Sequence, residues 1–205
     1  MTCRVTHAQG YVEARDSLAQ DWIGFFESQL PEALWQMLPN RGRDAPRHFA
    51  AWGLNALILS GGNSLGEEPV KDETDIALLE YALDNDIPVL GICRGMQVMH
   101  HYFGGRLQPA DKTLHVRGRH FLKSTSVGTI PAFTLEVNSY HTQCIRADEL
   151  TDAFHPLALC GDGTVEAMCA RDHRAYAVMW HPERDALPDP LTRHFLKILA
   201  GMDHD

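Results

Sequence analysis

Apolar residues are spaced differently in two parts of the chain, and the change falls after residue 103. Before it, compact apolar runs at residues 55–59 and 88–92 predict buried strands, and a short strand is expected around Val5. Helical spacing at residues 16–29 and 71–86 predicts amphipathic helices between these strands. Strands that alternate with helices form a parallel sheet that is covered on both faces.

After residue 103 the apolar segments become shorter and richer in β-forming residues. They predict strands at residues 120–124, 134–137, 157–160, 165–169 and 175–180, and residues 190–200 close the chain as an amphipathic helix. Near the start, Asp16 or Ser17 is expected to cap the first helix, and Pro31 to end it. The pattern predicts an α/β fold: a three-layer sandwich on a mainly parallel sheet, with extra antiparallel strands.

Composition limits the class of protein. With 205 residues and 44% apolar content, the chain suits a single domain over residues 1–205 with a sizeable core. The N-terminus lacks the basic start and apolar stretch of a signal peptide, and no apolar run is long enough to span a bilayer. Five cysteines occur without paired spacing, so we expect free thiols and a cytoplasmic location.

A formal charge of −9 argues against general affinity for nucleic acid or for an anionic membrane. Residues 106–123 depart from this trend, because they hold five Lys or Arg and one acid, Asp111. The segment is interpreted either as a solvated basic loop or as a site for an anionic part of a substrate. In the second case Arg117, Arg119 and His120 are the candidate side chains.

Chemistry is indicated first at Cys93, which lies between Gly91 and Gly95 where a buried strand runs into a helix. This G-x-C-x-G pattern is typical of a nucleophile elbow, a sharp turn that exposes a strained nucleophile. The glycines leave room for close packing, and the helix N-terminus favours the thiolate. A buried structural cysteine is the alternative interpretation.

A thiol nucleophile needs a base, and the base needs a group that orients it. His181 follows a predicted strand, so it can reach the same edge of the sheet as Cys93. Glu183 lies two residues further on, and Pro182 stiffens the connection. An exposed turn whose His and Glu face water remains the alternative for this segment taken alone.

Four separated blocks together resemble the class I glutamine amidotransferase family, closest to its stand-alone γ-glutamyl hydrolase branch, the peptidase C26-like members. In order they are Leu59-Ser60-Gly61-Gly62-Asn63, Pro88-Val89-Leu90-Gly91-Ile92-Cys93-Arg94-Gly95-Met96-Gln97, Val137-Asn138-Ser139-Tyr140-His141 and Trp180-His181-Pro182-Glu183. The resemblance covers most of the chain and implies a flavodoxin-like α/β fold. It also implies a catalytic triad of Cys93, His181 and Glu183 and no cofactor.

The same resemblance implies roles for residues that the pattern alone does not assign. Backbone N–H groups at Gly61, Gly62 and Arg94 would form an oxyanion hole, in which each donor is worth about 3 kcal/mol. Gln97, with the backbone around Ser139, Tyr140 and His141, would hold the α-amino and α-carboxylate groups of a glutamyl moiety. The implied reaction is hydrolysis of a γ-glutamyl amide through a glutamyl thioester, releasing glutamate.

Within the family, three features resemble the enzymes that cleave γ-glutamyl-CDP-amidate to cytidine diphosphoramidate in capsule biosynthesis. They are the short length, the segments Arg15-Asp16-Ser17-Leu18 and Leu38-Pro39-Asn40, and the step Tyr102-Phe103-Gly104-Gly105. The basic residues 106–123 would suit a diphosphate leaving group, because Arg and Lys pair well with phosphate oxygens.

Several alternatives stay open at this level. The enzyme could be a γ-glutamyl-GABA-type hydrolase, or the glutaminase subunit of a two-component amidotransferase with a synthetase partner. A homo-oligomer and a catalytically inactive regulatory binding module are further possibilities. A metal site is disfavoured because the histidines show no H-x-x-x-H spacing, although His115, His120 and His141 are among the candidates.

Overall fold

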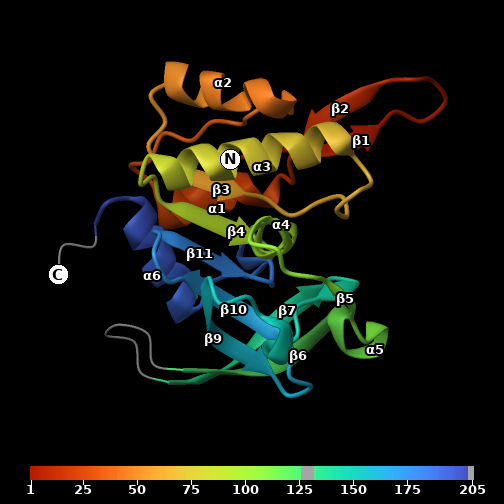
Figure 1. The fold of residues 1–205 in the computed structure, drawn as a ribbon, viewed down its shortest axis with the longest axis vertical. Helices are drawn as coiled ribbons and strands as arrows, with labels where there is room; N and C mark the ends of the chain where they lie inside the picture. Colours follow the sequence, from red (N-terminus) through yellow and green to blue (C-terminus); the bar gives the residue numbers. More distant parts are fainter. Residues whose placement is uncertain (126–131, 203–205) are drawn as a thin grey trace.

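The computed structural model describes residues 1–125 and 132–202, and its centre is a seven-stranded sheet (Figure 1). In spatial order the strands are β3 (Leu57–Leu59), β4 (Val89–Ile92), β11 (Ala175–Val178), β10 (Val165–Ala170), β9 (Phe154–Cys160), β6 (Val116–Ser124) and β7 (Thr134–Tyr140). The expected α/β fold with added antiparallel strands is confirmed. The sheet carries the ends of β4 and β11 side by side, which positions the chemistry described below.

The balance of the sheet differs from the expected one. Parallel pairing is confined to β3, β4 and β11, while the four other neighbouring pairs are antiparallel. The reason is the length of the connections. Strands β9, β10 and β11 follow one another through short turns, which permit only antiparallel pairing, whereas a helix connects β3 to β4.

Helices α4 (Arg94–Tyr102) and α6 (Pro190–Leu199) cover opposite faces of the parallel strands. Gly91 of β4 lies directly against α4, and its register partner on β11 is Ala177. The preceding residue of β11, Tyr176, stacks its ring on Phe195 of α6 at a centroid distance of 4.8 Å. Because successive strand residues point to opposite faces, the two helices form the outer layers of a sandwich.

The other helices lie beyond and beside the parallel edge. Helix α3 (Pro69–Asp84) contacts β3 and α4, and α2 (Ala45–Ala51) packs on α3 (Figure 1). One hydrophobic cluster of buried residues extends from Met1 to Leu199 and joins both parts of the sheet. Among the helices that the structure describes, none has the length and apolar character needed to cross a membrane.

The predicted first helix begins later than expected. Helix α1 spans Asp21–Gln29 and starts at Gln20, whose side chain makes no capping bond. The preceding segment is instead β2 (Ala14–Ser17), an antiparallel partner of β1 (Arg4–His7). Neither Asp16 nor Ser17 caps the helix, because Asp16 pairs with Val5 and accepts a hydrogen bond from the Asn40 backbone at 2.9 Å.

The basic residues 106–123 are not a loop. They contain β5 (Gln108–Pro109), which pairs with β8 (Gln143–Cys144), then α5 (Lys112–His115), and then most of β6. Short 3₁₀ turns complete the chain at Gly42–Asp44, Ala147–Glu149 and Pro182–Arg184. The last of these turns carries Glu183 directly after the end of β11.

Candidate active site

Cys93 occupies a sharp turn between β4 and α4, with φ 50° and ψ −100°. A positive φ is rare for a residue with a side chain and marks a strained backbone. The flanking glycines permit the close packing that this turn requires: a Cβ on Gly95 would lie 2.2 Å from the Leu59 carbonyl oxygen, and one on Gly91 would lie 2.8 Å from the Gly95 carbonyl carbon. The turn therefore has the geometry of a nucleophile elbow.

The thiol of Cys93 is the one most disposed to ionise. Burial opposes its ionisation, but the hydrogen bond and charge of His181 outweigh burial and lower the pKa of Cys93. Its position at the N-terminus of α4 adds a favourable dipole. The other four cysteines have raised pKa values, and burial is the main cause in each: Cys3, Cys144, Cys160 and Cys169.

His181 follows β11 and reaches Cys93 from the neighbouring strand. Its Nδ1–H donates to Oε1 of Glu183 at 2.8 Å, which leaves Nε2 for the thiol. Burial lowers the pKa of His181, but hydrogen bonds with Cys93 and Glu183 outweigh it and raise that pKa to about 9. These directions favour a thiolate facing an imidazolium at neutral pH, although the two groups titrate as a pair.

Asn138 holds the backbone of His181 from both sides. Its Nδ2 donates to the His181 carbonyl at 2.8 Å, and its Oδ1 accepts from the His181 N–H at 3.0 Å. The same amide nitrogen donates to Asp185 at 3.1 Å. The sequence placed Asn138 within a motif but assigned it no task, because this clamp joins segments that lie far apart along the chain.

The turn at Gly61 and Gly62 lies against the imidazole of His181. A Cβ on Gly61 would be only 2.7 Å from Cε1 of that ring. Gly62 has φ 151°, and a Cβ there would lie 2.7 Å from Cβ of Arg4. The structure thus brings the predicted oxyanion turn to the histidine, and both positions exclude a side chain.

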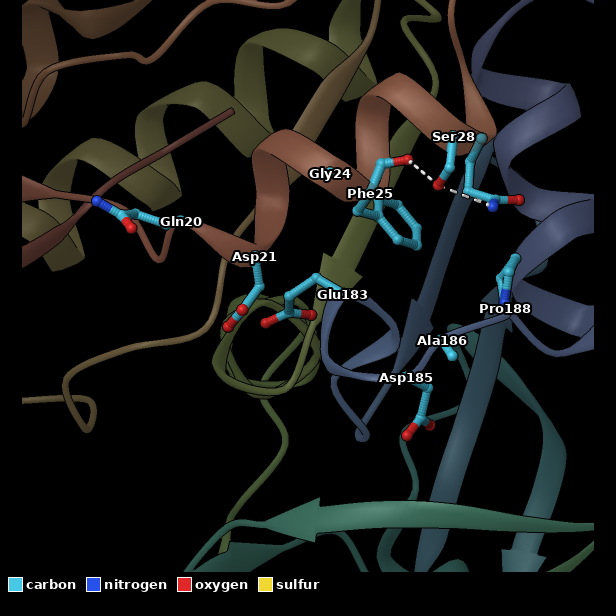
Figure 2. A pocket seen from close by; sticks show the side chains of 10 residues that line it. Gln20, Asp21, Gly24, Phe25, Ser28, Glu183, Asp185, Ala186 and Pro188 are labelled. Atoms are coloured by element: carbon cyan, nitrogen blue, oxygen red, sulfur yellow. Dashed lines mark hydrogen bonds between the residues drawn. The ribbon is translucent and has the colours of Figure 1, made fainter.

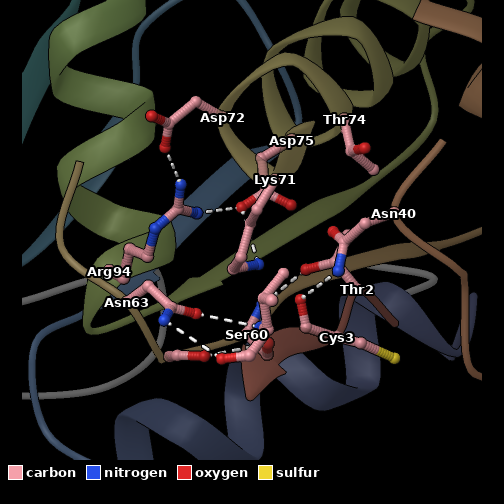
Figure 3. A network of polar contacts seen from close by, with 12 residues as sticks. Thr2, Cys3, Asn40, Ser60, Asn63, Lys71, Asp72, Thr74, Asp75 and Arg94 are labelled. Carbon is pink, nitrogen blue, oxygen red and sulfur yellow. Dashed lines mark hydrogen bonds and ion pairs between the residues drawn. The ribbon is translucent and has the colours of Figure 1, made fainter. Parts of the chain in front are cut away.

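Below this turn, the side chain of Arg94 points into the protein. It pairs with Asp72 and Asp75, and Lys71 Nζ lies 3.0 Å from Asp75 Oδ2 (Figure 3). Only its backbone N–H remains for the predicted oxyanion role. The same region is tied to the N-terminal segment, since Asn63 accepts from the Val5 N–H at 2.9 Å and donates to the Val5 carbonyl at 3.1 Å.

The predicted glutamyl-binding residues divide into two groups. Gln97 lies one helical turn beyond Cys93, and the exposed Tyr140 places its ring 5.9 Å from that of His181. Ser139 is buried and donates its hydroxyl to the His115 carbonyl at 2.9 Å. His141 is also buried, with Nδ1 2.9 Å from the Gln143 carbonyl. Only the backbone of Ser139 and His141 is therefore available toward the site.

The three basic candidates for an anionic leaving group also differ. His120 is 4% exposed and faces Glu166, so it is unavailable to a substrate. Arg119 pairs with Asp185 at 2.8 Å and lies 3.5 Å from Glu136. Arg117 is exposed, and within residues 1–125 and 132–202 the structure gives it no ion pair.

Arg184 is a basic residue that the sequence analysis missed. Its guanidinium lies 4.3 Å from the centroid of the Tyr140 ring, over the face of that ring. Its position directly after Glu183 was visible in the sequence, but the stacking on Tyr140 requires β7 and the 3₁₀ turn Pro182–Arg184 to meet.

A shallow pocket of about 380 Å³ lies between α1 and the chain after β11 (Figure 2). Its lining includes Glu183, Asp185 and Asp21, but neither Cys93 nor His181. Three acids make this surface unfavourable for a phosphate group. We therefore do not place the substrate's leaving group there.

Candidate metal ligands lie beside the triad rather than within it. In the part of the chain that the structure describes, two sets of side chains bring ligand atoms within 4.8 Å of one another. They are His115, His120 and Cys160, and His115, His141 and Glu166. Spacing along the sequence missed both sets, because their members come from different strands.

Comparison with known proteins bears on this geometry. The family model described as peptidase C26 matches residues 37–183, a span that runs from before the Gly61-Gly62 turn to Glu183. The chain belongs to the peptidase C26 family. This confirms the predicted family, and the predicted class of enzyme, a hydrolase of γ-glutamyl amides, is confirmed at the level of that family.

Individual relatives agree with this membership. A γ-glutamyl-CDP-amidate hydrolase of Campylobacter jejuni is 28% identical over 90% of this chain and 89% of its own length. A glutamine-hydrolysing component of the GMP synthase of Natronomonas pharaonis is 32% identical over 72% of this chain and 77% of its own. The crystal structure of a glutamine amido transferase from Methylobacillus flagellatus shares the fold, with a TM-score of 0.62 over 88% of this chain and 69% of its own, at 19% identity.

Proposed function

We propose that this enzyme hydrolyses γ-glutamyl-CDP-amidate, releasing glutamate and cytidine diphosphoramidate, with Cys93 as nucleophile. The observation that carries the reaction type is the arrangement of Cys93, His181 and Glu183. A strained thiol of lowered pKa faces an imidazole that is held by a carboxylate at 2.8 Å. The Campylobacter jejuni relative, which matches over 90% of this chain, supports the substrate.

The proposed reaction begins from the thiolate. The thiolate of Cys93 attacks the γ-carbonyl carbon, and the developing oxyanion accepts hydrogen bonds from backbone N–H groups at the Gly61-Gly62 turn and at Arg94. The imidazolium of His181 then protonates the leaving nitrogen, and the C–N bond breaks to give a glutamyl thioester. Neutral His181 removes a proton from water, which attacks the thioester and regenerates the thiolate with release of glutamate.

The leaving group would lie at Tyr140. Arg184 covers the ring of Tyr140, which itself lies against His181, the residue that protonates the departing nitrogen. On the neighbouring strand, Arg117 forms a bulge between the partners of Tyr140 and Ser139 and is exposed. Two cations that flank the leaving nitrogen suit a diphosphate, because guanidinium groups pair with phosphate oxygens. Arg119 would contribute less, since Asp185 and Glu136 already neutralise it.

Competing substrates test this proposal directly. Glutamate release is measured for γ-glutamyl-CDP-amidate, glutamine and γ-glutamyl-GABA, with Cys93→Ala as the inactive control. We expect kcat/KM to be highest for the diphosphate substrate, and Arg184→Ala and Arg117→Ala to raise KM for that substrate alone. Lys112→Ala, an exposed cation on α5, is the matched control. Equal rates on all three compounds would exclude the diphosphate but leave γ-glutamyl hydrolysis in place.

A second candidate is a glutaminase subunit that passes ammonia to a synthetase partner. The Natronomonas pharaonis relative, 32% identical over 72% of this chain, favours it. This alternative predicts weak glutaminase activity in the isolated chain and strong activity after addition of a co-purifying partner. Hydrolysis of γ-glutamyl-CDP-amidate at full rate without a partner would contradict it.

A further inference from the structure

Four buried side chains next to the active site form what we call the His–Glu cluster: His115, His120, His141 and Glu166. They come from the end of α5, from β6, from the residue after β7 and from β10. Their exposed fractions are 0%, 4%, 3% and 0%, respectively. The proposed reaction uses none of these four side chains.

Two of the histidines are anchored from outside by their outer ring nitrogens. His141 Nδ1 lies 2.9 Å from the Gln143 carbonyl, which can only accept, so this nitrogen carries the hydrogen. His115 Nε2 lies 2.9 Å from the carboxylate oxygen Oδ2 of Asp162, which also accepts. In the neutral rings, His141 Nε2 and His115 Nδ1 are therefore lone pairs. Outer partners of this kind commonly orient histidines that bind a metal.

Both lone pairs face the same carboxylate oxygen. His141 Nε2 lies 3.5 Å and His115 Nδ1 3.6 Å from Oε1 of Glu166, and His120 Nε2 lies 3.4 Å from Oε2. Within the described residues, none of these three ring nitrogens has a hydrogen-bond partner, and neither does Glu166 Oε2. Buried acceptors that face one another without a donor are costly.

The separations match those of metal ligands better than those of ion pairs. An imidazolium that donates to a carboxylate is about 2.8 Å from it, well short of the 3.4–3.6 Å found in this cluster. Ligand atoms about 2.0 Å from a tetrahedral Zn²⁺ lie about 3.3 Å apart. Imidazole nitrogens with one carboxylate also form a typical zinc ligand set.

We propose that His115, His141 and Glu166 bind a zinc ion, with His120 as the nearest further ligand. Cys160, which groups with His115 and His120, borders the site. All ligands are buried, so the ion is structural: it joins β6, β10 and the end of β7. The Gln143 carbonyl accepts from both His141 at 2.9 Å and Gln97 at 3.2 Å, so the ion also supports the glutamyl-binding residue Gln97.

Metal content tests this site without any measure of activity. The full chain carries Cys93→Ala, so that the catalytic thiol cannot bind zinc, and has no histidine tag. After incubation with Zn²⁺ and gel filtration, mass spectrometry of the metal should give about one zinc per chain. Glu166→Gln should bind zinc at least about 100-fold more weakly, because loss of an outer-shell partner alone costs up to that amount. His155→Gln, an exposed histidine, is the matched control and should retain the ion.

Wild-type spectroscopy keeps the proposal testable if Glu166→Gln does not fold. Co²⁺ added to the Cys93→Ala chain should give the intense visible absorption of a tetrahedral site, and a chelator should lower the Tm. Zinc that is not retained, equal retention by Glu166→Gln, or a Tm indifferent to chelator and zinc would overturn the proposal. Each of these results would show an imidazole–carboxylate network without a metal.

Discussion

Two buried sets of histidine and glutamate lie near each other in this protein, and one distance separates their chemistry. In the catalytic pair, His181 and Glu183, the nitrogen and oxygen are 2.8 Å apart and share a hydrogen. In the His–Glu cluster, His141 and Glu166 are 3.5 Å apart, beyond a good hydrogen bond. The same two residue types therefore serve different ends: the first set orients a ring that transfers a proton, and the second presents lone pairs to an ion.

The outer contacts explain this difference. Glu183 takes the inner hydrogen of its histidine, so the opposite nitrogen of His181 is left for Cys93. In the cluster, a backbone carbonyl and Asp162 take the outer hydrogens, so the free nitrogens point inward. The position of the acceptor decides which ring nitrogen stays available.

The largest expected effect comes from breaking the catalytic pair. His181→Asn should lower kcat/KM by about 10⁴-fold or more, because both the base and the acid of the reaction are lost. Zinc bound per chain should stay unchanged, since the cluster does not include His181. Glutamate release and metal content are measured on the same preparation. Activity within tenfold of wild type would remove His181 from the mechanism.

A smaller effect is expected when His181 is only displaced. Asn138→Ala removes both hydrogen bonds that fix its backbone, and a misplaced catalytic group can cost about 100-fold in rate. Asn85→Ala, an exposed asparagine at the end of α3, should leave the rate unchanged. If kcat were the same in both variants, the clamp would be dispensable.

The pH dependence separates the ion pair from a neutral pair. The pKa of Cys93 is lowered, so the thiolate persists below the ordinary range of a thiol, and the pKa of His181 is raised to about 9. Activity should therefore fall on the acid side as the thiolate is protonated, and near pH 9 as His181 loses the proton that it gives to the leaving group. Alkylation of Cys93 by iodoacetamide should lose only the acid limb.

The variant His181→Asn sharpens this test. Without its partner the buried thiol has a higher pKa, and each unit lowers the thiolate fraction about tenfold at neutral pH. Peptide mapping follows the alkylation of Cys93 apart from the other cysteines. A profile that is identical in the variant and in wild type would contradict the thiolate–imidazolium pair.

The smallest expected effect lies on the other side of the comparison. Glu166→Gln should raise KM for the γ-glutamyl substrate about tenfold, because the support of Gln97 through the Gln143 carbonyl is weakened. The alkylation rate of Cys93 should not change. Steady-state kinetics with His155→Gln as control checks this, and a loss in kcat with unchanged KM would contradict it.

Local chemistry made the first region predictable from the sequence. Gly91, Cys93 and Gly95 are contiguous with a buried strand and a helix, so their pattern alone predicts the turn, and Glu183 follows His181 by two residues. Helix α1 was predicted to begin at residue 16 because its apolar spacing extends that far. The pairing of Asp16 with Val5, which a local pattern cannot contain, replaces its first turn with β2.

The cluster was invisible for the same physical reason. His115 and Glu166 are 51 residues apart, and only the antiparallel arrangement of β6, β9 and β10 brings them together. Metal-site spacing applies to ligands on one helix or one turn, and here every ligand comes from a different element. The stacking of Arg184 on Tyr140 likewise depends on β7 reaching the turn after β11.

One measurement tests the central claim, that Cys93 forms a glutamyl thioester. The enzyme is mixed with γ-glutamyl substrate, quenched in acid within a turnover and digested, and its peptides are analysed by mass spectrometry. We predict one glutamyl group on Cys93, removed by hydroxylamine and missing from Cys93→Ala. Glutamate release without any adduct, or with the adduct on another cysteine, would contradict the account.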